Sequence, residues 1–120
     1  MKITLSNRDE LFVIRLEAVA WFTAEDHYTR VCYINGNNAL LPFGLSETCE
    51  AVFADNVYGK RFMRVSRSVL LNLGNVSHVS LLKEELTFTD VHGKSVRLRL
   101  SKRLLRNVAA HLKGEKTLCG

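Results

Sequence analysis

The chain has 120 residues, of which 47% are hydrophobic, and its formal net charge is +5. This length is enough for one domain with a hydrophobic core, and the composition is too apolar for a disordered chain. No apolar stretch is long enough to span a membrane and the N-terminus lacks a signal-peptide pattern, so we expect a cytoplasmic protein. The three cysteines are widely spaced, which favours neither a disulfide framework nor a zinc site.

The charge is divided unevenly along the chain. Residues 1–59 carry four Lys and Arg against eight Asp and Glu, a balance of −4, whereas residues 60–120 carry thirteen against four, a balance of +9. A positive field over one part of a surface attracts polyanions such as nucleic acids or anionic lipids. Charge alone does not distinguish between these partners.

The first half of the chain predicts short strands and one helix. Apolar or alternating runs rich in β-branched and aromatic residues predict strands over residues 2–5, 11–16, 18–22, 29–34 and 39–43. A polar loop is expected over Thr23–Arg30, and the Asn35-Gly36 pair predicts a hairpin turn because Asn and Gly tolerate a positive φ. Over residues 45–55 the apolar spacing changes to a helical period, with Ser46 as the expected N-cap.

The second half predicts further strands and a closing helix. After residues 62–73, the alternation of apolar and polar residues predicts strands over residues 76–82, 85–90 and 95–100. On the last of these, Arg97 and Arg99 alternate with apolar residues, and we expect them on a solvated sheet face. A helix is expected over residues 101–113 with Ser101 as its N-cap, and residues 115–120 are expected to form a mobile tail.

The segment Phe62–Leu73, FMRVSRSVLLNL, carries the most chemistry. It places two arginines and two serines within five residues, ahead of an apolar run: Arg64, Ser66, Arg67 and Ser68. Guanidinium and hydroxyl groups bind phosphate oxygens and guanine edges, and an apolar strand would fix them to the core. Two interpretations stay open at this point, an anion-binding or nucleic-acid-binding edge and a half-buried strand with solvated arginines.

Two further segments hold candidate binding residues. Lys102 and Arg103 fall in the first turn of the closing helix, where cations oppose the helix dipole at a cost of roughly a few tenths of a kcal/mol each. A polyanion bound by these side chains and by the free N–H groups would explain the placement, and tolerance of a small penalty is the alternative. In the Thr23–Arg30 loop, a histidine, an aromatic residue, a threonine and an arginine could reach base edges or phosphates: His27, Tyr28, Thr29 and Arg30. The loop alone also fits an ordinary hairpin connection.

The sequence carries no catalytic or metal-binding pattern. The serines lack a G-x-S-x-G setting, the four histidines have no H-x-x-x-H or H-E-x-x-H spacing, and the glycines are scattered at turns. We therefore expect no enzyme, no metal site and no cofactor.

Three segments, in this order, resemble the LytTR DNA-binding domain of bacterial response regulators and transcription factors. FMRVSRSVLLNL is similar to the family's central motif, F-x-R-V-H-R-S followed by an apolar stretch. AVAWFTAEDHYTRV resembles its strand–loop–strand segment, and VRLRLSKRLL resembles its closing strand and the turn into the last helix. The resemblance covers roughly residues 8–113 and implies one domain over residues 1–114. The implied fold is mainly β with two helices (α+β), an elongated, sandwich-like set of small antiparallel sheets with a helix packed between sheets.

The resemblance also implies how the chain would bind its partner. In the family, loops rather than a recognition helix enter successive grooves of double-stranded promoter DNA. Carried over by motif position, the base-reading residues are Thr29, Arg67 and Arg103, and the phosphate-contacting neighbours are Arg30, Arg64, Ser66, Ser68 and Lys102. Ser66 replaces a histidine common in the motif and Asp26 stands where glycine is frequent, so the DNA sequence that is read would differ.

The resemblance further implies a regulatory setting. It suggests two copies on direct repeats, with a dimer on DNA and DNA bending, and a receiver domain or sensor kinase as partners that lie outside these 120 residues. Two other functions fit the same basic surface: a β module that binds RNA or an anionic nucleotide messenger, and a module that binds an acidic protein partner.

Overall fold

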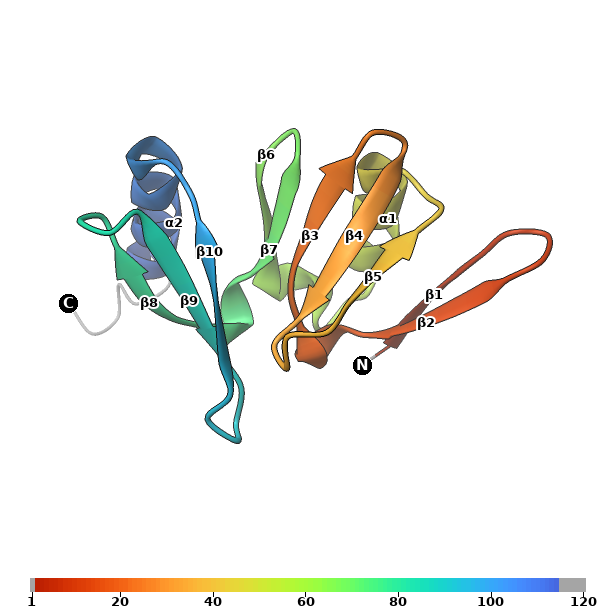
Figure 1. Cartoon of the computed structure of the whole chain (residues 1–120), viewed down its shortest axis with the longest axis horizontal. Helices are drawn as coiled ribbons and strands as arrows, with labels where there is room; N and C mark the ends of the chain where they lie inside the picture. Colours follow the sequence, from red (N-terminus) through yellow and green to blue (C-terminus); the bar gives the residue numbers. More distant parts are fainter. Residues whose placement is uncertain (1, 115–120) are drawn as a thin grey trace.

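Three antiparallel sheets make up most of the part of the chain that the computed structural model describes, residues 2–114 (Figure 1). The first is a hairpin of β1 (Lys2–Ser6) and β2 (Leu11–Arg15). The second has the strand order β5-β4-β3-β7-β6, and the third has the order β10-β9-β8. The molecule is elongated, with extents of 49 × 27 × 27 Å. The predicted fold class, mainly β with two helices, is confirmed.

The remaining elements follow in chain order. The strands of the five-stranded sheet are β3 (Val19–Glu25), β4 (Tyr28–Tyr33), β5 (Asn38–Leu41), β6 (Phe62–Ser66) and β7 (Val69–Asn72). The three-stranded sheet consists of β8 (Val76–Ser80), β9 (Glu85–Thr89) and β10 (Ser95–Arg99). The helices are α1 (Leu45–Phe53) and α2 (Lys102–Gly114), and short 3-10 segments cover Leu16–Ala18, Gly59–Arg61 and Leu73–Asn75.

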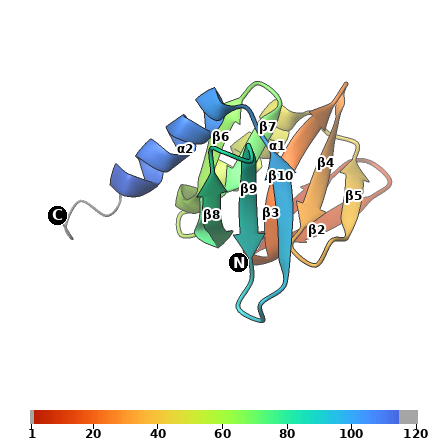
Figure 2. The same ribbon diagram turned by 60° about the vertical axis from the view of Figure 1, so that its left-hand side comes forward.

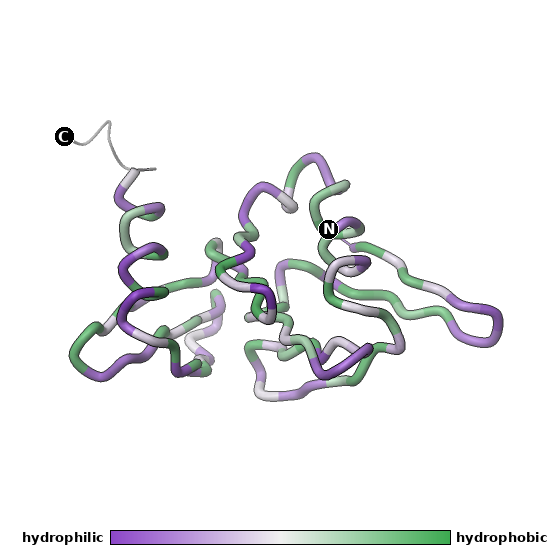
Figure 3. The backbone as a smooth tube through the Cα atoms, turned by 90° about the horizontal axis from the view of Figure 1, so that it is seen from above, coloured by the Kyte–Doolittle hydropathy of each residue, from purple (hydrophilic) through white to green (hydrophobic). Residues whose placement is uncertain are grey.

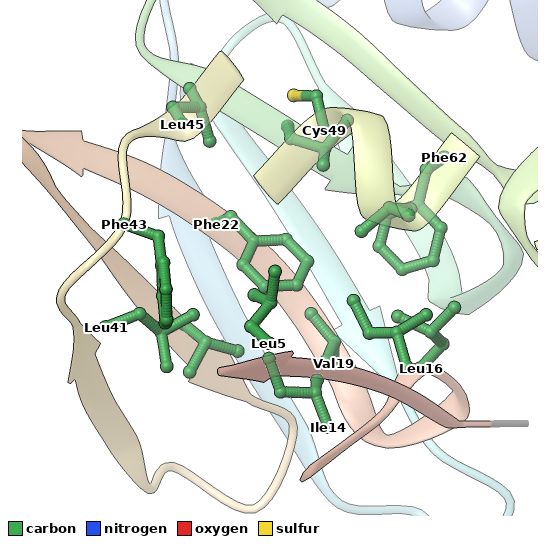
Figure 4. Close-up of a cluster of buried hydrophobic side chains, with 14 of the residues drawn as sticks. Leu5, Ile14, Leu16, Val19, Phe22, Leu41, Phe43, Leu45, Cys49 and Phe62 are labelled. Atoms are coloured by element: carbon green, nitrogen blue, oxygen red, sulfur yellow. The ribbon is translucent and has the colours of Figure 1, made fainter. Parts of the chain in front are cut away.

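One face of the five-stranded sheet forms the first hydrophobic core. Phe22 and Phe62 point from the sheet toward α1, while Leu5 and Ile14 come from the β1–β2 hairpin (Figure 4). Cys49 faces this core from α1, and burial raises the pKa of its thiol. Helix α1 therefore lies between the hairpin and the five-stranded sheet, which agrees with the helix between sheets expected from the resemblance.

The opposite face of the five-stranded sheet forms the second core with the three-stranded sheet and α2 (Figure 2). The ring centroids of Trp21 and Phe88 lie 5.3 Å apart across this contact. Leu105 and Val108 of α2 are fully buried here. Helix α2 is thereby held against the sheets with its first turn beside the end of β10.

A buried asparagine fixes the strand that carries the central motif. Asn72, at the end of β7, donates hydrogen bonds to the carbonyl oxygens of Leu16 (3.2 Å) and Val19 (2.9 Å). Its own side-chain oxygen accepts a hydrogen bond from the Gly74 amide at 3.0 Å. Because these buried polar groups satisfy one another, β7 is locked to the start of β3.

Most predicted elements are confirmed, with two corrections. The expected Thr23–Arg30 loop is almost entirely strand, because β3 continues to Glu25 and β4 begins at Tyr28. The expected N-cap at Ser46 is wrong, since Gly44 occupies that position and makes no side-chain cap. The Ser101 cap is confirmed, with its hydroxyl accepting from the Leu104 amide at 3.3 Å. The predicted tail over residues 115–120 lies outside the described residues.

Candidate nucleic-acid interface

Three of the sequence-predicted segments come together on one edge of the molecule. The β3–β4 turn (Asp26–His27), the β6–β7 turn (Arg67–Ser68) and the start of α2 (Ser101–Arg103) all lie at the upper edge in Figure 1. We call these three segments the loop edge, and Figure 3 views the molecule from this side. The β9–β10 turn, which ends at Lys94, lies at the opposite edge. The fold thus aligns segments that are far apart in the sequence.

The β6–β7 turn is more cationic than the β3–β4 turn. Arg67 and Ser68 are exposed at its tip, and no carboxylate pairs with Arg67 within residues 2–114. A shallow hollow of about 400 Å³ beside the turn is lined by Arg64, Val65, Ser66 and Arg67. A guanidinium that is exposed and free of carboxylates has its planar set of donors available for a phosphate or a base edge.

The other two polar residues of this segment are engaged by the turn itself. The Ser66 hydroxyl accepts a hydrogen bond from the Ser68 amide at 3.2 Å. The Arg64 guanidinium lies against the backbone carbonyl oxygens of Ser66 and Arg67. Both arginines are exposed, but Arg64 and Ser66 hydrogen-bond to the backbone of the turn, whereas Arg67 stands at its tip.

The start of α2 presents two exposed cations with no acidic neighbour in the first turn. Lys102 and Arg103 are exposed, and Arg106 follows one turn later. The Ser101 hydroxyl and carbonyl accept from the amides of Leu104 (3.3 Å) and Leu105 (3.0 Å). The earlier amides of the helix remain directed out of its N-terminus, where an anion would be stabilised by both the helix dipole and the side chains.

The β3–β4 turn differs from its prediction. Thr29, expected to read a base, is fully buried, and its hydroxyl donates a hydrogen bond to the Phe43 carbonyl oxygen at 2.9 Å. The Thr48 hydroxyl lies 3.5 Å from the same oxygen atom of Thr29. This corrects the prediction, because a side chain with no exposed surface supports the core and has no access to a base edge.

Arg30 is hydrogen-bonded to its neighbours on the sheet. Its guanidinium donates to both carboxylate oxygens of Glu25 and, at 2.7 Å, to the side-chain oxygen of Asn38. The hydrogen bond from Arg30 lowers the pKa of Glu25, and the same bond raises the pKa of Arg30. A phosphate would have to compete with this carboxylate, so Arg30 is a weaker anion site than Arg67.

Comparison with protein families shows the family of the chain. The family described as the LytTr DNA-binding domain matches residues 9–113, most of the 120-residue chain. The chain belongs to the LytTR family. It is thus a LytTR DNA-binding domain, as its central motif predicted.

A solved structure shares the LytTR fold of this chain. It is described as the LytTr DNA-binding domain of a DNA response regulator from Bacillus cereus, and it aligns with a TM-score of 0.53 at 18% sequence identity. The alignment covers 90% of this chain and 95% of that one. The comparison with curated proteins gave no match. Over residues 2–114 of this LytTR domain, neither helix is long and apolar enough to cross a membrane.

At the β3–β4 turn of the LytTR domain, two of the four candidates that the sequence offers are accessible to a partner. His27 and Tyr28 are exposed, and 48% of the Tyr28 surface is accessible. The signal that separates them from Thr29 is the strand alternation, because Thr29 shares its face of β4 with the buried Val31.

Proposed function

We propose that this LytTR domain binds double-stranded promoter DNA with sequence preference, as the DNA-binding part of a bacterial transcription regulator. The observation that carries the proposal is the position of Arg67, exposed at the middle segment of the loop edge and free of any carboxylate within residues 2–114. An arginine with its planar donors free can form two hydrogen bonds with the N7 and O6 atoms of guanine.

The arrangement of the loop edge supports contacts in successive grooves. Its three segments follow one another along the long axis of the molecule (Figure 1). Segments arranged in this way suit loops that enter neighbouring grooves of a duplex.

The structure refines the proposed role of each segment. Arg67 and Arg103 remain the proposed base-reading residues, and Lys102, Ser66 and Ser68 the proposed phosphate contacts. In the β3–β4 turn we assign the contacts to His27 and Tyr28, because Thr29 is buried and Arg30 is paired with Glu25. Two copies on direct repeats, and control by a receiver domain or a sensor kinase, complete the proposal.

The most informative experiment is selection of duplexes from a random pool, followed by affinity measurements on the selected site. We expect a preferred sequence and a strong dependence on salt. If about six phosphates are neutralised, log K should fall about five units per tenfold rise in salt concentration. RNA of the same sequence and cyclic dinucleotides, used as competitors, should displace the duplex poorly.

Other outcomes would contradict the proposal in different ways. Efficient displacement by RNA or by a nucleotide would indicate a different anionic ligand. Affinity that barely changes with salt would exclude a surface built on phosphate contacts. Equal affinity for all duplexes would leave DNA binding but remove sequence recognition.

A further inference from the structure

The β6–β7 turn has a backbone shape that two-residue hairpins seldom adopt. Ser66 pairs with Val69, so Arg67 and Ser68 alone connect the two strands. Two-residue hairpins prefer turns with a positive φ at one or both central residues, since this matches the twist of the strands. Within residues 2–114 a positive φ occurs only at Asp26, Gly36, Glu84 and Gly93. The turn that presents Arg67 therefore needs support from elsewhere.

A single side chain provides much of that support. The Arg64 guanidinium donates to the Ser66 carbonyl oxygen through Nε (3.3 Å) and to the Arg67 carbonyl oxygen through Nη2 (2.9 Å). Its Nη1 atom donates to the Ser46 hydroxyl on α1 at 3.3 Å. The planar guanidinium of Arg64 thus links the carbonyl oxygens of Ser66 and Arg67 to the first turn of α1.

The strand is shaped so that Arg64 reaches these atoms. The register of β6 against β7 shifts between Arg64 and Ser66, which marks a bulge at Val65. Bulges bend a strand and redirect side chains. On the other side of the turn, the Ala24 amide donates to the Ser68 carbonyl oxygen at 2.9 Å, which ties Ser68 to β3. Arg64 supplies the corresponding contacts for Ser66 and Arg67.

We propose that Arg64 is a positioning residue, which fixes the β6–β7 turn on α1 so that Arg67 is presented to DNA in one orientation. This inference rests on the proposed function, and it replaces the phosphate-contact role predicted for Arg64. Three of the N–H groups of Arg64 are used within the protein. The variant Arg64→Lys keeps the positive charge, but an ammonium group lacks the planar set of donors that bridges two carbonyl oxygens and a hydroxyl. This variant therefore separates the effect of the charge from the effect of the hydrogen bonds.

The first test is a double-mutant cycle on the ratio of specific to non-specific DNA affinity. Arg64→Ala and Arg64→Lys should both reduce this ratio about tenfold, within the discrimination that one arginine–guanine pair supplies. In an Arg67→Ala background, Arg64→Ala should reduce the ratio little further, because its effect acts through Arg67. Lys102→Ala is the comparison, since loss of a phosphate contact weakens specific and non-specific duplexes alike.

A phosphate-contact role for Arg64 predicts the opposite pattern. Arg64→Lys and Arg64→Ala would then both retain the specificity ratio of the natural protein. Arg64→Ala would lower the salt slope by about one, and its loss of affinity would add fully to that of Arg67→Ala. Either result would overturn the proposal.

A second test does not depend on DNA. Amide hydrogen exchange and NMR order parameters of Arg67 and Ser68 should show a more mobile turn in Arg64→Ala and Arg64→Lys, with the melting temperature of the core retained. Ser46→Ala should show a smaller change of the same kind. If the turn is as ordered in these variants as in the natural protein, the positioning role is wrong. If the natural protein has no sequence preference, the proposed function fails while this measurement still decides the role of Arg64.

Discussion

The β3–β4 and β6–β7 turns connect strands of the same sheet and lie on the same edge, yet they offer opposite electrostatics. The β3–β4 turn carries Glu25 and Asp26, and its nearest arginine, Arg30, is paired with Glu25. The β6–β7 turn carries Arg67 with no paired carboxylate within residues 2–114. An arginine near a turn is therefore not automatically a DNA contact, because the cross-strand neighbours decide whether its donors are free.

The two turns also obtain their shapes differently. Asp26 adopts a φ of 56° at the first central position of its turn, a conformation that aspartate tolerates better than most residues. The β6–β7 turn has no such residue and is held by Arg64 from outside. The first turn is thus shaped locally, whereas the second depends on a side chain anchored to α1.

Arg67→Ala should have the largest effect on recognition. Loss of a bidentate contact to guanine should cost about 1–3 kcal/mol of discrimination at one base pair, measured by titrating the selected duplex and single-base variants. Lys94→Ala, which removes a cation at the opposite edge, serves as the control and should leave discrimination unchanged. An equal loss of affinity for every sequence would mean that Arg67 contacts only phosphate.

Thr29→Val should affect folding and leave recognition intact. The substitution keeps the volume but removes the hydrogen bond to the buried Phe43 carbonyl oxygen, so the free energy of unfolding should fall by about 1–2 kcal/mol in urea titrations. DNA affinity of the folded protein should stay within about twofold. Thr23→Val, on the other face of the sheet, is the matched control and should cost less. A stable variant with lost specificity would restore Thr29 as a DNA contact.

The patterns of apolar and polar residues predicted most strands of the described chain, and the central motif predicted the family. The patterns did not divide residues 62–73 into two strands, β6 and β7, joined by a turn at Arg67–Ser68. They also did not locate the free cations. Glu25 and Asn38 meet Arg30 on strands that flank it, and Ser46 meets Arg64 across 18 residues of sequence. Such pairings depend on strand register and helix placement, which local patterns do not specify. The burial of Thr29, in contrast, could be predicted from the local pattern, because Thr29 lies two residues before Val31 and therefore on the same face of the strand.

Lys102→Ala should have a moderate and uniform effect. Removal of one phosphate contact should weaken all duplexes several-fold at low salt and reduce the slope of log K against log salt by about one. Lys94→Ala makes the same chemical change at the opposite edge and should alter the slope much less. Equal slopes for the two variants would show that only net charge matters, and that the loop edge has no special role.

Glu25→Gln should have the smallest effect and in the opposite direction. Removal of the carboxylate frees Arg30 and reduces repulsion of phosphate, so DNA affinity should rise a few-fold, with a steeper salt dependence. The hydrogen bond from Arg30 lowers the pKa of Glu25, so the ion pair persists at pH values below the usual range of glutamate titration and is lost only as the pH falls through this lowered value. Unchanged or weaker binding by Glu25→Gln would mean that the β3–β4 turn does not approach phosphate.

An NMR titration of the isotopically labelled chain with the selected duplex tests most directly whether the loop edge binds DNA. We expect the largest amide shifts in three separate segments, Asp26–Tyr28, Ser66–Ser68 and Ser101–Arg103, with little change around Lys94 at the opposite edge. Shifts concentrated at the opposite edge, or confined to one of the three segments, would contradict the claim that the loop edge is the DNA-binding surface.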